Sequence, residues 1–331
     1  MQQAYGFQNG STIAGTRFHQ NTKLEGSCPE QALELFAVRP AGTRVLERLQ
    51  GLELESELQN CCKVRDELLV TKTNTQIGDI IYYETQKNKK IEVDEKIYDM
   101  LPKNNNIFSL QTLPFQNKPY KKCAVVGNGG ILLNSCCGSE IDQADYVFRF
   151  NLPPMNYSYD VGTKTDLVTS NPSILTKRFS KLNERRKPFS DMVKAYGSAL
   201  IIMPAFYSIG NKDLSFKVYY TLKDFGSELK VFFFHPVYLK NLSDYWTSKG
   251  LTAKRLSSGL MLVSSALELC DELTIYGFWP FPEDQEGNYV PHHYYDNRIP
   301  KPGFHSMPDE FFFYAQLHSL GALKLKVGRC Y

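Results

Sequence analysis

The sequence has no apolar run long enough to cross a membrane as a helix, which takes roughly 18 or more such residues. Its start, residues 1–27, is polar and lacks the apolar core of a signal peptide. The longest apolar stretches, residues 200–207 and 231–239, have the length of strands and are interrupted by Pro or His. We therefore expect either a soluble intracellular protein or one whose N-terminal anchor is missing from this sequence.

Motifs of several common enzyme classes are also missing. No two cysteines have C-x-x-C spacing, which argues against a zinc site. The H-E-x-x-H sequence of many zinc proteases is also absent, which argues against an enzyme of that class. No D-x-D pair is present, although glycosyltransferases that hold a nucleotide-sugar diphosphate through a divalent cation usually need such carboxylates. The net charge of +3 at pH 7 gives no reason to expect a nucleic-acid partner.

Cysteines and glycosylation sequons are present in numbers that suit a secretory protein. The sequons begin at Asn9, Asn156 and Asn241, although such triplets also arise by chance. The even number of cysteines, 8, suggests disulfides in a secretory compartment, whereas buried free thiols would serve equally well in the cytosol. Composition therefore leaves the compartment open.

The chain changes character near Pro119. Residues 1 to about 40 are rich in Gly, Asn, Gln and Thr and predict a flexible segment. Residues 43–70 have the apolar spacing of an amphipathic helix, and residues 72–106 are polar enough for a linker or a loosely packed extension. The regular alternation of elements begins only after these segments.

Beyond Pro119, short apolar runs alternate with segments of helical spacing. The predicted strands are 123–126, 146–150, 166–169, 199–203, 229–234 and 273–278, and the predicted helices between them include 172–182, 240–249 and 258–271. This alternation predicts an α/β fold whose largely parallel sheet is covered by helices on both faces. Ligands of such folds bind beyond the carboxyl ends of the strands, which directs attention to residues 127–130, 151–154 and 277–281.

Two short segments carry candidate functional groups. The Gly-Asn-Gly-Gly loop at 127–130 either brings main-chain N–H groups to a phosphate or is a plain tight turn. Leu132 stands where a G-x-G-x-x-G sequence has its last glycine, which disfavours a nicotinamide oxidoreductase. His292, His293 and His305, with Glu310, suggest metal binding or acid–base chemistry about as strongly as they suggest ordinary loop positions.

Four ordered segments resemble the sialylmotifs of the sialyltransferases. Residues 122–154 look like the large sialylmotif, 256–278 like the small one, 293–296 (HYYD) like the third, and His305 with Glu310 like the very small motif. The resemblance covers residues 120–330. The GNGG, NLPP, GFWPF and HHYYDN strings are similar to those of the α2,8-sialyltransferases, most to the type VI enzymes and less closely to types I and V.

This resemblance implies an inverting, metal-independent transfer that needs no cofactor. The donor would be CMP-sialic acid, and the acceptor a terminal sialic acid, on an O-glycan or a ganglioside, that gains one or a few residues at its 8-hydroxyl. The mixed charges of residues 212–255 indicate a solvated face rather than a track for a long polyanion. The alternative is a catalytically inactive relative that binds sialoglycans.

The resemblance also assigns roles to individual residues. His305 would be the general base, Glu310 would position it, and His293 would support the donor phosphate. The other donor-binding positions would be Asn128, Asn151, Ser257, Ser258, Gly259, Trp279 and His292, with no metal ligand. The family disulfides would pair Cys123 with Cys270 and Cys137 with Cys330, which leaves Cys28, Cys61, Cys62 and Cys136 unassigned.

Fold, division into domains and location follow from the same likeness. It implies a Rossmann-like α/β catalytic domain, a variant of the GT-A-like arrangement. We expect a flexible stem in residues 1–42, a helical and polar stem extension in 43–118 and the catalytic domain in 119–331. Members of the family are single-pass type II proteins of the Golgi membrane, so we expect a lumenal protein whose anchor is absent from this sequence.

Overall fold

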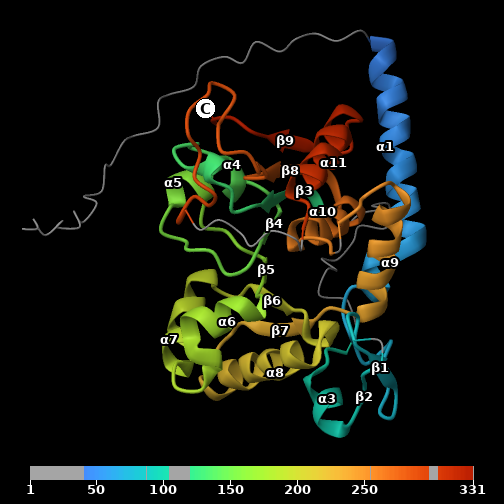
Figure 1. Ribbon diagram of the computed structural model, residues 1–331, viewed down its shortest axis with the longest axis vertical. Helices are drawn as coiled ribbons and strands as arrows, with labels where there is room; N and C mark the ends of the chain where they lie inside the picture. The colour runs from blue at the N-terminus through green and yellow to red at the C-terminus, as the bar shows by residue number, and fades with distance from the viewer. Residues whose placement is uncertain (1–40, 87, 104–119, 254, 298–304, 331) are drawn as a thin grey trace, which may run out of the picture.

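The computed structural model describes residues 41–86, 88–103, 120–253, 255–297 and 305–330. A seven-stranded sheet with the order β7-β6-β5-β4-β3-β8-β9 lies at its centre (Figure 1). Each neighbouring pair of these strands is parallel. The strands are β3 (Tyr120–Val126), β4 (Tyr146–Arg149), β5 (Leu167–Thr169), β6 (Leu200–Met203), β7 (Lys230–Phe233), β8 (Cys270–Tyr276) and β9 (Lys324–Lys326). The predicted α/β fold class is confirmed, and every predicted strand lies in this sheet.

Helices cover both faces of the sheet. They are α1 (Ala41–Cys62), α2 (Val64–Glu67), α3 (Glu95–Met100), α4 (Gly138–Asp142), α5 (Ser158–Val161), α6 (Pro172–Phe179), α7 (Arg186–Val193), α8 (Ile209–Asp224), α9 (Pro236–Ser248), α10 (Ser258–Leu269) and α11 (Met307–Ser319). Short 3₁₀ turns follow several strands and helices, among them η5 (Ala205–Tyr207) after β6. The sequence pattern did not predict α7, α8, α11 or β9.

Strand β3 shows how the sheet is buried on both sides. Cys123 and Val125 belong to the hydrophobic cluster that α1, α9, α10 and α11 share. Ala124 and Val126 point the other way, into a smaller cluster with residues of α4 and α5. Because successive side chains of a strand face opposite sides, a strand that is covered on both sides is apolar throughout, which is the pattern that the sequence shows.

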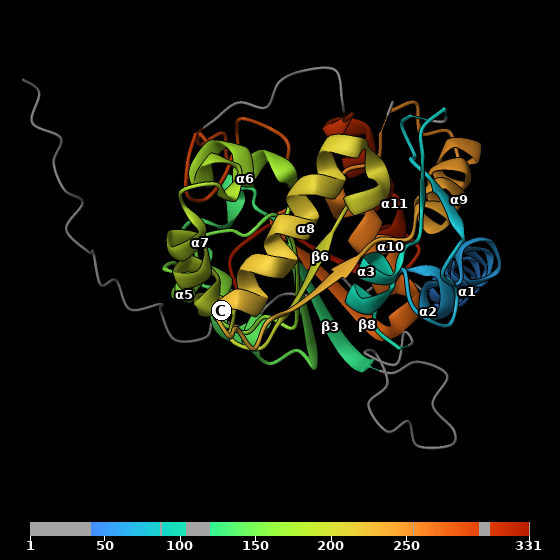
Figure 2. The same cartoon turned by 90° about the horizontal axis from the view of Figure 1, so that it is seen from below.

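The outer strands β5 to β7 are covered on their second face by α6, α7 and α8. Ile202 of β6 joins the cluster of α9 and α10, while its neighbours Ile201 and Met203 join a cluster with buried residues of these three helices. Helix α8 packs against β7 and crosses over this end of the sheet when the protein is seen from below (Figure 2).

The N-terminal part of the described chain packs against the sheet domain. Helix α1 runs beside α9 (Figure 1), and the hairpin of β1 (Ile80–Tyr82) and β2 (Lys90–Glu92) lies with α3 below them. Leu58 of α1 and Val93 and Ile97 near α3 are buried in the main clusters. The described residues of 72–103 are therefore packed more closely than their polar composition indicates, because apolar side chains such as Ile81, Val93 and Ile97 are buried, although Ile77 and Tyr82 stay exposed. The predicted division into domains stays a prediction.

Disulfides join distant parts of the sequence. Cys123 at β3 is bonded to Cys270 at β8, and Cys137 is bonded to Cys330, which are the two pairs that the resemblance implies. Cys61 and Cys62 form a bond between neighbours at the end of α1. Cys136 is also disulfide-bonded, while Cys28 lies outside the described residues.

The described residues also locate two of the three sequons. Asn156 is exposed just before α5, whereas Asn241 is partly buried within α9; Asn9 lies outside the described residues. Residues 1–40 of the predicted stem lie outside them as well. No helix of the described part is both long and apolar enough to pass through a membrane.

Candidate active site

Three asparagines stand directly beyond the carboxyl ends of β3, β4 and β5. The Asn128 amide donates a hydrogen bond to the Phe150 carbonyl at 3.1 Å, and the Asn171 N–H donates to the Asn151 side-chain oxygen, also at 3.1 Å. The Asn128 Oδ1 atom is buried and has no hydrogen-bond partner among the described residues. A buried acceptor without a partner is costly, so this atom is available to a ligand donor.

The chain after β4 is held in a strained conformation. Asn151 and Leu152 both have positive φ, 60° and 48°, which residues other than glycine rarely adopt. The N–H groups of these two residues donate to the Thr169 hydroxyl and to the Thr169 carbonyl, each at 3.1 Å. Tyr294 donates to the Pro154 carbonyl at 2.9 Å and fixes the far end of this loop. Strain maintained by several bonds is typical of functional loops.

The Gly-Asn-Gly-Gly loop after β3 is clamped between two other segments. The Gly129 N–H donates to the Gly277 carbonyl at 2.9 Å, and a Cβ at Gly129 would lie only 2.5 Å from that oxygen. A Cβ at Gly130 would lie 1.9 Å from the Pro291 carbonyl oxygen. These positions therefore require glycine for close packing of main chains, whatever the loop binds.

The histidine segment at 292–296 docks onto this loop. Gly129 and His293 form an antiparallel bridge, and the Tyr294 N–H donates to the Asn128 carbonyl at 3.0 Å. The His293 Nδ1 atom lies 2.7 Å from an Asp296 carboxylate oxygen, so the carboxylate orients the ring. Burial lowers the pKa of His292, and the neighbouring His293 lowers it further. The third motif is thus next to the large one.

Ser257 connects the small motif to the very small one. Its hydroxyl caps α10 by accepting from the Leu260 N–H at 3.1 Å. Its own N–H donates to Glu310 Oε1 at 2.8 Å, and its hydroxyl donates to Glu310 Oε2. Glu310 is fully buried, and burial raises its pKa although the hydrogen bonds of Ser257 and Tyr314 oppose that shift. The carboxylate therefore holds the start of α10.

Ser258 and Gly259 complete the first turn of α10. The Ser258 hydroxyl is 3.4 Å from the Asn171 side-chain oxygen, which connects this turn to the asparagines at the edge of the sheet. A Cβ at Gly259 would lie 3.0 Å from the Phe278 ring and 3.1 Å from the Ser257 hydroxyl, so the turn packs closely. The free N–H groups at the start of this 12-residue helix favour a negatively charged ligand.

His305 lies just before α11 and is bound by the main chain. Its Nδ1 atom is 3.0 Å from the Arg255 carbonyl, two residues before Ser257. Burial of part of the ring lowers the pKa of His305, and the positive charge of Arg255 also lowers it, although the bond to the carbonyl opposes both. The ring nevertheless keeps an exposed surface. The lowered pKa thus favours the neutral imidazole, and the exposed part of the ring is open to a ligand.

Trp279 packs into an aromatic cluster at the end of β8. Its ring centroid lies 5.1 Å from that of Phe281 and 5.4 Å from that of Phe311 on α11. Its indole N–H donates to the Glu283 carbonyl at 2.8 Å. The tryptophan therefore contributes its ring face and edge, rather than its N–H, to whatever binds beside it.

The structure thus gathers the predicted residues along one edge, with two differences from expectation. Glu310 was predicted to position His305, but its carboxylate bonds Ser257 and Tyr314, while the His305 ring bonds the Arg255 carbonyl. Asn171 and Arg255, which the sequence did not single out, lie among the predicted residues. The only feature of the sequence that could have pointed to Asn171 as a site residue is its position directly after the third predicted strand, in the Asn-Pro-Ser sequence at 171–173.

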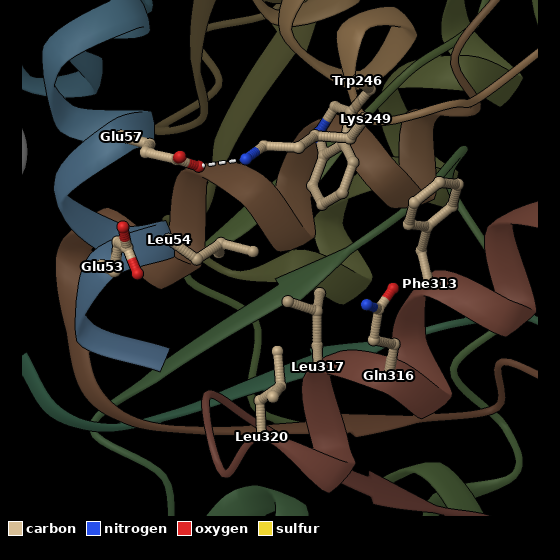
Figure 3. Close-up of a pocket in the computed structure, with 9 residues that line it drawn as sticks. All are labelled: Glu53, Leu54, Glu57, Trp246, Lys249, Phe313, Gln316, Leu317 and Leu320. Carbon is tan, nitrogen blue, oxygen red and sulfur yellow. Dashed lines mark ion pairs between the residues drawn. The ribbon is translucent and has the colours of Figure 1, made fainter. Parts of the chain in front are cut away.

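A pocket of about 370 Å³ lies between α1, α9 and α11 (Figure 3). It is lined by apolar side chains, by Glu53 and Gln316 and by the Glu57–Lys249 ion pair, and none of the predicted site residues lines it. Among the residues that the structure describes, no three His, Cys, Asp or Glu side chains cluster closely enough to hold a metal ion.

The fold, together with the residues at the carboxyl ends of its strands, defines an α/β enzyme with a histidine beside loops that suit an anionic ligand. The chain belongs to glycosyltransferase family 29, the sialyltransferases, whose model matches residues 69–322. It is 48% identical to the human protein named alpha-2,8-sialyltransferase 8E over 84% of this chain and 72% of that one. It is 47% identical to human alpha-2,8-sialyltransferase 8F over 83% of this chain and 68% of that one. These matches confirm the predicted family and enzyme class.

Among solved structures, a mammalian sialyltransferase aligns with a TM-score of 0.48 and 24% sequence identity, over 80% of this chain and 90% of that chain. The family match begins at residue 69, well before Pro119, and takes in the closely packed residues from Val70 to Leu101.

Proposed function

We propose that this protein transfers sialic acid from CMP-sialic acid to the 8-hydroxyl of a terminal sialic acid, on an O-glycan or a ganglioside. The observation that carries the proposal is the anchoring of His305 to a main-chain carbonyl beside the donor-binding motifs. The α2,8 linkage is supported by the names of the similar proteins. Addition of one or a few residues is supported by the mixed charges of residues 212–255, where 8 Lys and Arg are interspersed with 4 Asp and Glu.

The bond to Arg255 sets the protonation of the His305 ring. A carbonyl oxygen can only accept a hydrogen bond, so Nδ1 carries the proton and Nε2 has the free lone pair. This is the form that a general base needs. The lowered pKa favours the neutral ring, and a base of this kind typically contributes about 10²–10⁴-fold in rate.

In the proposed reaction, the acceptor 8-hydroxyl attacks the anomeric carbon of the donor while the bond to the CMP phosphate breaks. The hydroxyl proton passes to Nε2 of His305, and the bonding electrons leave with the phosphate, so that the configuration inverts. The sugar carries oxocarbenium-like positive charge at the transition state. The departing phosphate is a weak base, so it needs hydrogen-bond donors rather than an acid.

The contacts with CMP-sialic acid come from the carboxyl ends of the strands. We assign them to Asn128, whose unpartnered Oδ1 would accept a hydrogen bond from CMP-sialic acid, and to the strained loop at Asn151. Ser257, Ser258 and Gly259 would bind its anionic part through the start of α10. His293 and His292 would lie at the phosphate, and Trp279 would present its ring to the nucleotide.

We propose that Glu310 positions His305 indirectly. By fixing Ser257, its carboxylate fixes the segment that begins at Arg255, whose carbonyl holds the imidazole. Glu310 itself stands in the first turn of α11, directly after His305. One carboxylate would thus set the distance between the donor-binding turn and the base.

The proposed reaction needs no divalent cation, because CMP leaves with a single phosphate that the protein's own donors can stabilise. We also propose that the protein works in the Golgi lumen. The disulfides between distant segments and the exposed sequon at Asn156 support an oxidising secretory compartment.

The test is an assay of purified protein with CMP-sialic acid, EDTA and α2,3-sialylated acceptors, with glycolipid and glycoprotein compared in parallel. We expect transfer that EDTA does not reduce and that His305→Ala abolishes. His318→Ala, which changes an exposed histidine at the far end of α11, is the matched control and should remain active. Transfer to no sialylated acceptor would refute the proposed function, and loss of activity in EDTA would refute the metal-free mechanism.

The pH dependence tests the base separately. Because the pKa of His305 lies below its ordinary value of 6.5, we expect kcat/KM of the wild type to fall only below that pH. An acid limb that lies above pH 6.5, or one that His305→Ala retains, would contradict the assignment.

A further inference from the structure

The side chains of Glu84, Tyr207 and Arg255 form a polar cluster near His305 and have no part in the mechanism proposed so far. Arg255 supplies the carbonyl that holds the imidazole, and its guanidinium carbon lies 3.8 Å from the centre of the Tyr207 ring. Tyr207 ends the η5 turn beyond β6, next along the sheet from the asparagines that follow β3, β4 and β5. Glu84 comes from the segment after β1, whose N–H groups donate to the Phe206 and Tyr207 carbonyls. Three distant segments thus meet at this point.

The guanidinium of Arg255 is held in place but not neutralised by a hydrogen-bonded carboxylate. Its Nε atom is buried and lacks a hydrogen-bond partner among the described residues, and the same is true of Glu84 Oε2. Burial raises the pKa of Glu84 to about 7, although the charge of Arg255 opposes the shift. Near neutral pH, Glu84 therefore carries only part of a negative charge. The Tyr207 ring stabilises the cation by a face contact and leaves its donors free.

The position of this cation relative to the base indicates its ligand. The base must contact the attacking hydroxyl, so the outermost sugar of the acceptor binds at His305. The Arg255 carbonyl lies 3.0 Å from the His305 Nδ1 atom, so the residue that carries the guanidinium is in direct contact with the base. The positive charge of Arg255 also contributes to the lowered pKa of His305, after burial. A sialic acid that attacks through its own hydroxyl brings a carboxylate into this region. An arginine binds a carboxylate through two parallel hydrogen bonds.

We propose that Arg255 binds the carboxylate of the acceptor's terminal sialic acid and so selects sialylated acceptors over neutral ones. The inference rests on the proposed function and names a specificity residue for it. The Tyr207 ring lies against the guanidinium, and Glu84, which carries only part of a negative charge near neutral pH, competes weakly with the incoming carboxylate.

The test compares two acceptors at saturating CMP-sialic acid: an α2,3-sialylated glycan, and the same glycan with its sialic acid blocked as the methyl ester. For Arg255→Gln we expect the KM of the free-acid acceptor to rise about 10- to 100-fold, because a charge-assisted hydrogen-bonded pair is lost. The KM of the ester should not rise, since it has no charge to lose. The wild type should prefer the acid, and the variant should not.

Two further variants make the result specific. Arg255→Lys, which keeps the charge but loses the planar fork, should give a KM between the two. Arg185→Gln removes an exposed arginine before α7 and should leave both KM values unchanged. The carbonyl that holds His305 belongs to the main chain and is retained in every Arg255 variant.

Equal increases in KM for acid and ester in Arg255→Gln would show a structural role and overturn the inference. An unchanged KM for the acid would overturn it as well. Either result, with a wild type that transfers normally, leaves the proposed function intact. A wild type that transfers to no sialylated acceptor would overturn the proposed function and this inference together.

Discussion

Replacement of Glu310 tests whether one buried carboxylate joins the donor-binding turn to the helix of the base. In Glu310→Ala, the N–H and the hydroxyl of Ser257 both lose their acceptor in a fully buried place. Each buried group left without a partner costs about 1–3 kcal/mol, so we expect a loss of about 2–6 kcal/mol in the free energy of unfolding. In Glu310→Gln one acceptor oxygen is retained, so the expected loss is about 1–3 kcal/mol.

The assay is urea unfolding of the wild type and both variants, followed by the KM for CMP-sialic acid. We expect the donor KM to rise in the order of the stability losses, because the start of α10 loses its support. Asp309→Asn is the control, since this neighbouring carboxylate is half-buried and bonds Ser306 within its own turn. A loss below about 0.5 kcal/mol in Glu310→Ala, the range of ordinary surface changes, would refute the reasoning.

Three other predictions follow from the packing and the buried charges. The pKa of Glu84 rises from 4.5 to about 7 on folding, so the native state holds an extra proton between these values and the free energy of unfolding falls as pH rises through that window. Glu84→Gln should reduce this decline by about 1–3 kcal/mol, measured by urea unfolding at about pH 5 and pH 8. If the free energy of unfolding fell equally in the wild type and in Glu84→Gln between these two pH values, the prediction would be contradicted. Gly130→Ala should lower the free energy of unfolding by about 1–3 kcal/mol and impair donor binding, because its Cβ would lie 1.9 Å from a carbonyl oxygen. Gly210→Ala, in open space on α8, should be neutral or stabilising. Equal changes in stability for the two variants would refute this prediction. Replacing Cys123 and Cys270 by Ser should cost about 2–5 kcal/mol, since the bond closes a loop of 147 residues, and unchanged thermal unfolding would speak against it.

The sheet could be predicted from the sequence, and several helices could not. The part of β3 that is buried on both faces, residues 123–126, is apolar and is followed by a glycine-rich turn. Helix α8 has only four buried residues among 16, and they are mixed with polar and aromatic side chains, so no regular apolar stripe marks it. Strand β9 has three residues, two of them Lys, and it is defined only by pairing with β8.

The motif residues of the site could be predicted from resemblance, but the contacts between them could not. Glu310 follows His305 closely in the sequence, which suggested a direct contact. The helix instead directs its side chain inward to Ser257, 53 positions away. The bond between His305 and Arg255, and the contact of Ser258 with Asn171, likewise depend on how segments far apart in the sequence are packed. Such pairs become visible only once the sheet has brought the segments to one edge.

The most direct test of the central claim is the position of the bond that the enzyme forms. The wild type is incubated with isotopically labelled CMP-sialic acid and an α2,3-sialylated acceptor, and the product is oxidised with periodate and analysed by mass spectrometry. We predict a disialylated product whose inner sialic acid resists periodate, because substitution at its 8-hydroxyl leaves no neighbouring pair of free hydroxyls. An inner residue shortened by periodate, or no labelled product at all, would contradict the account.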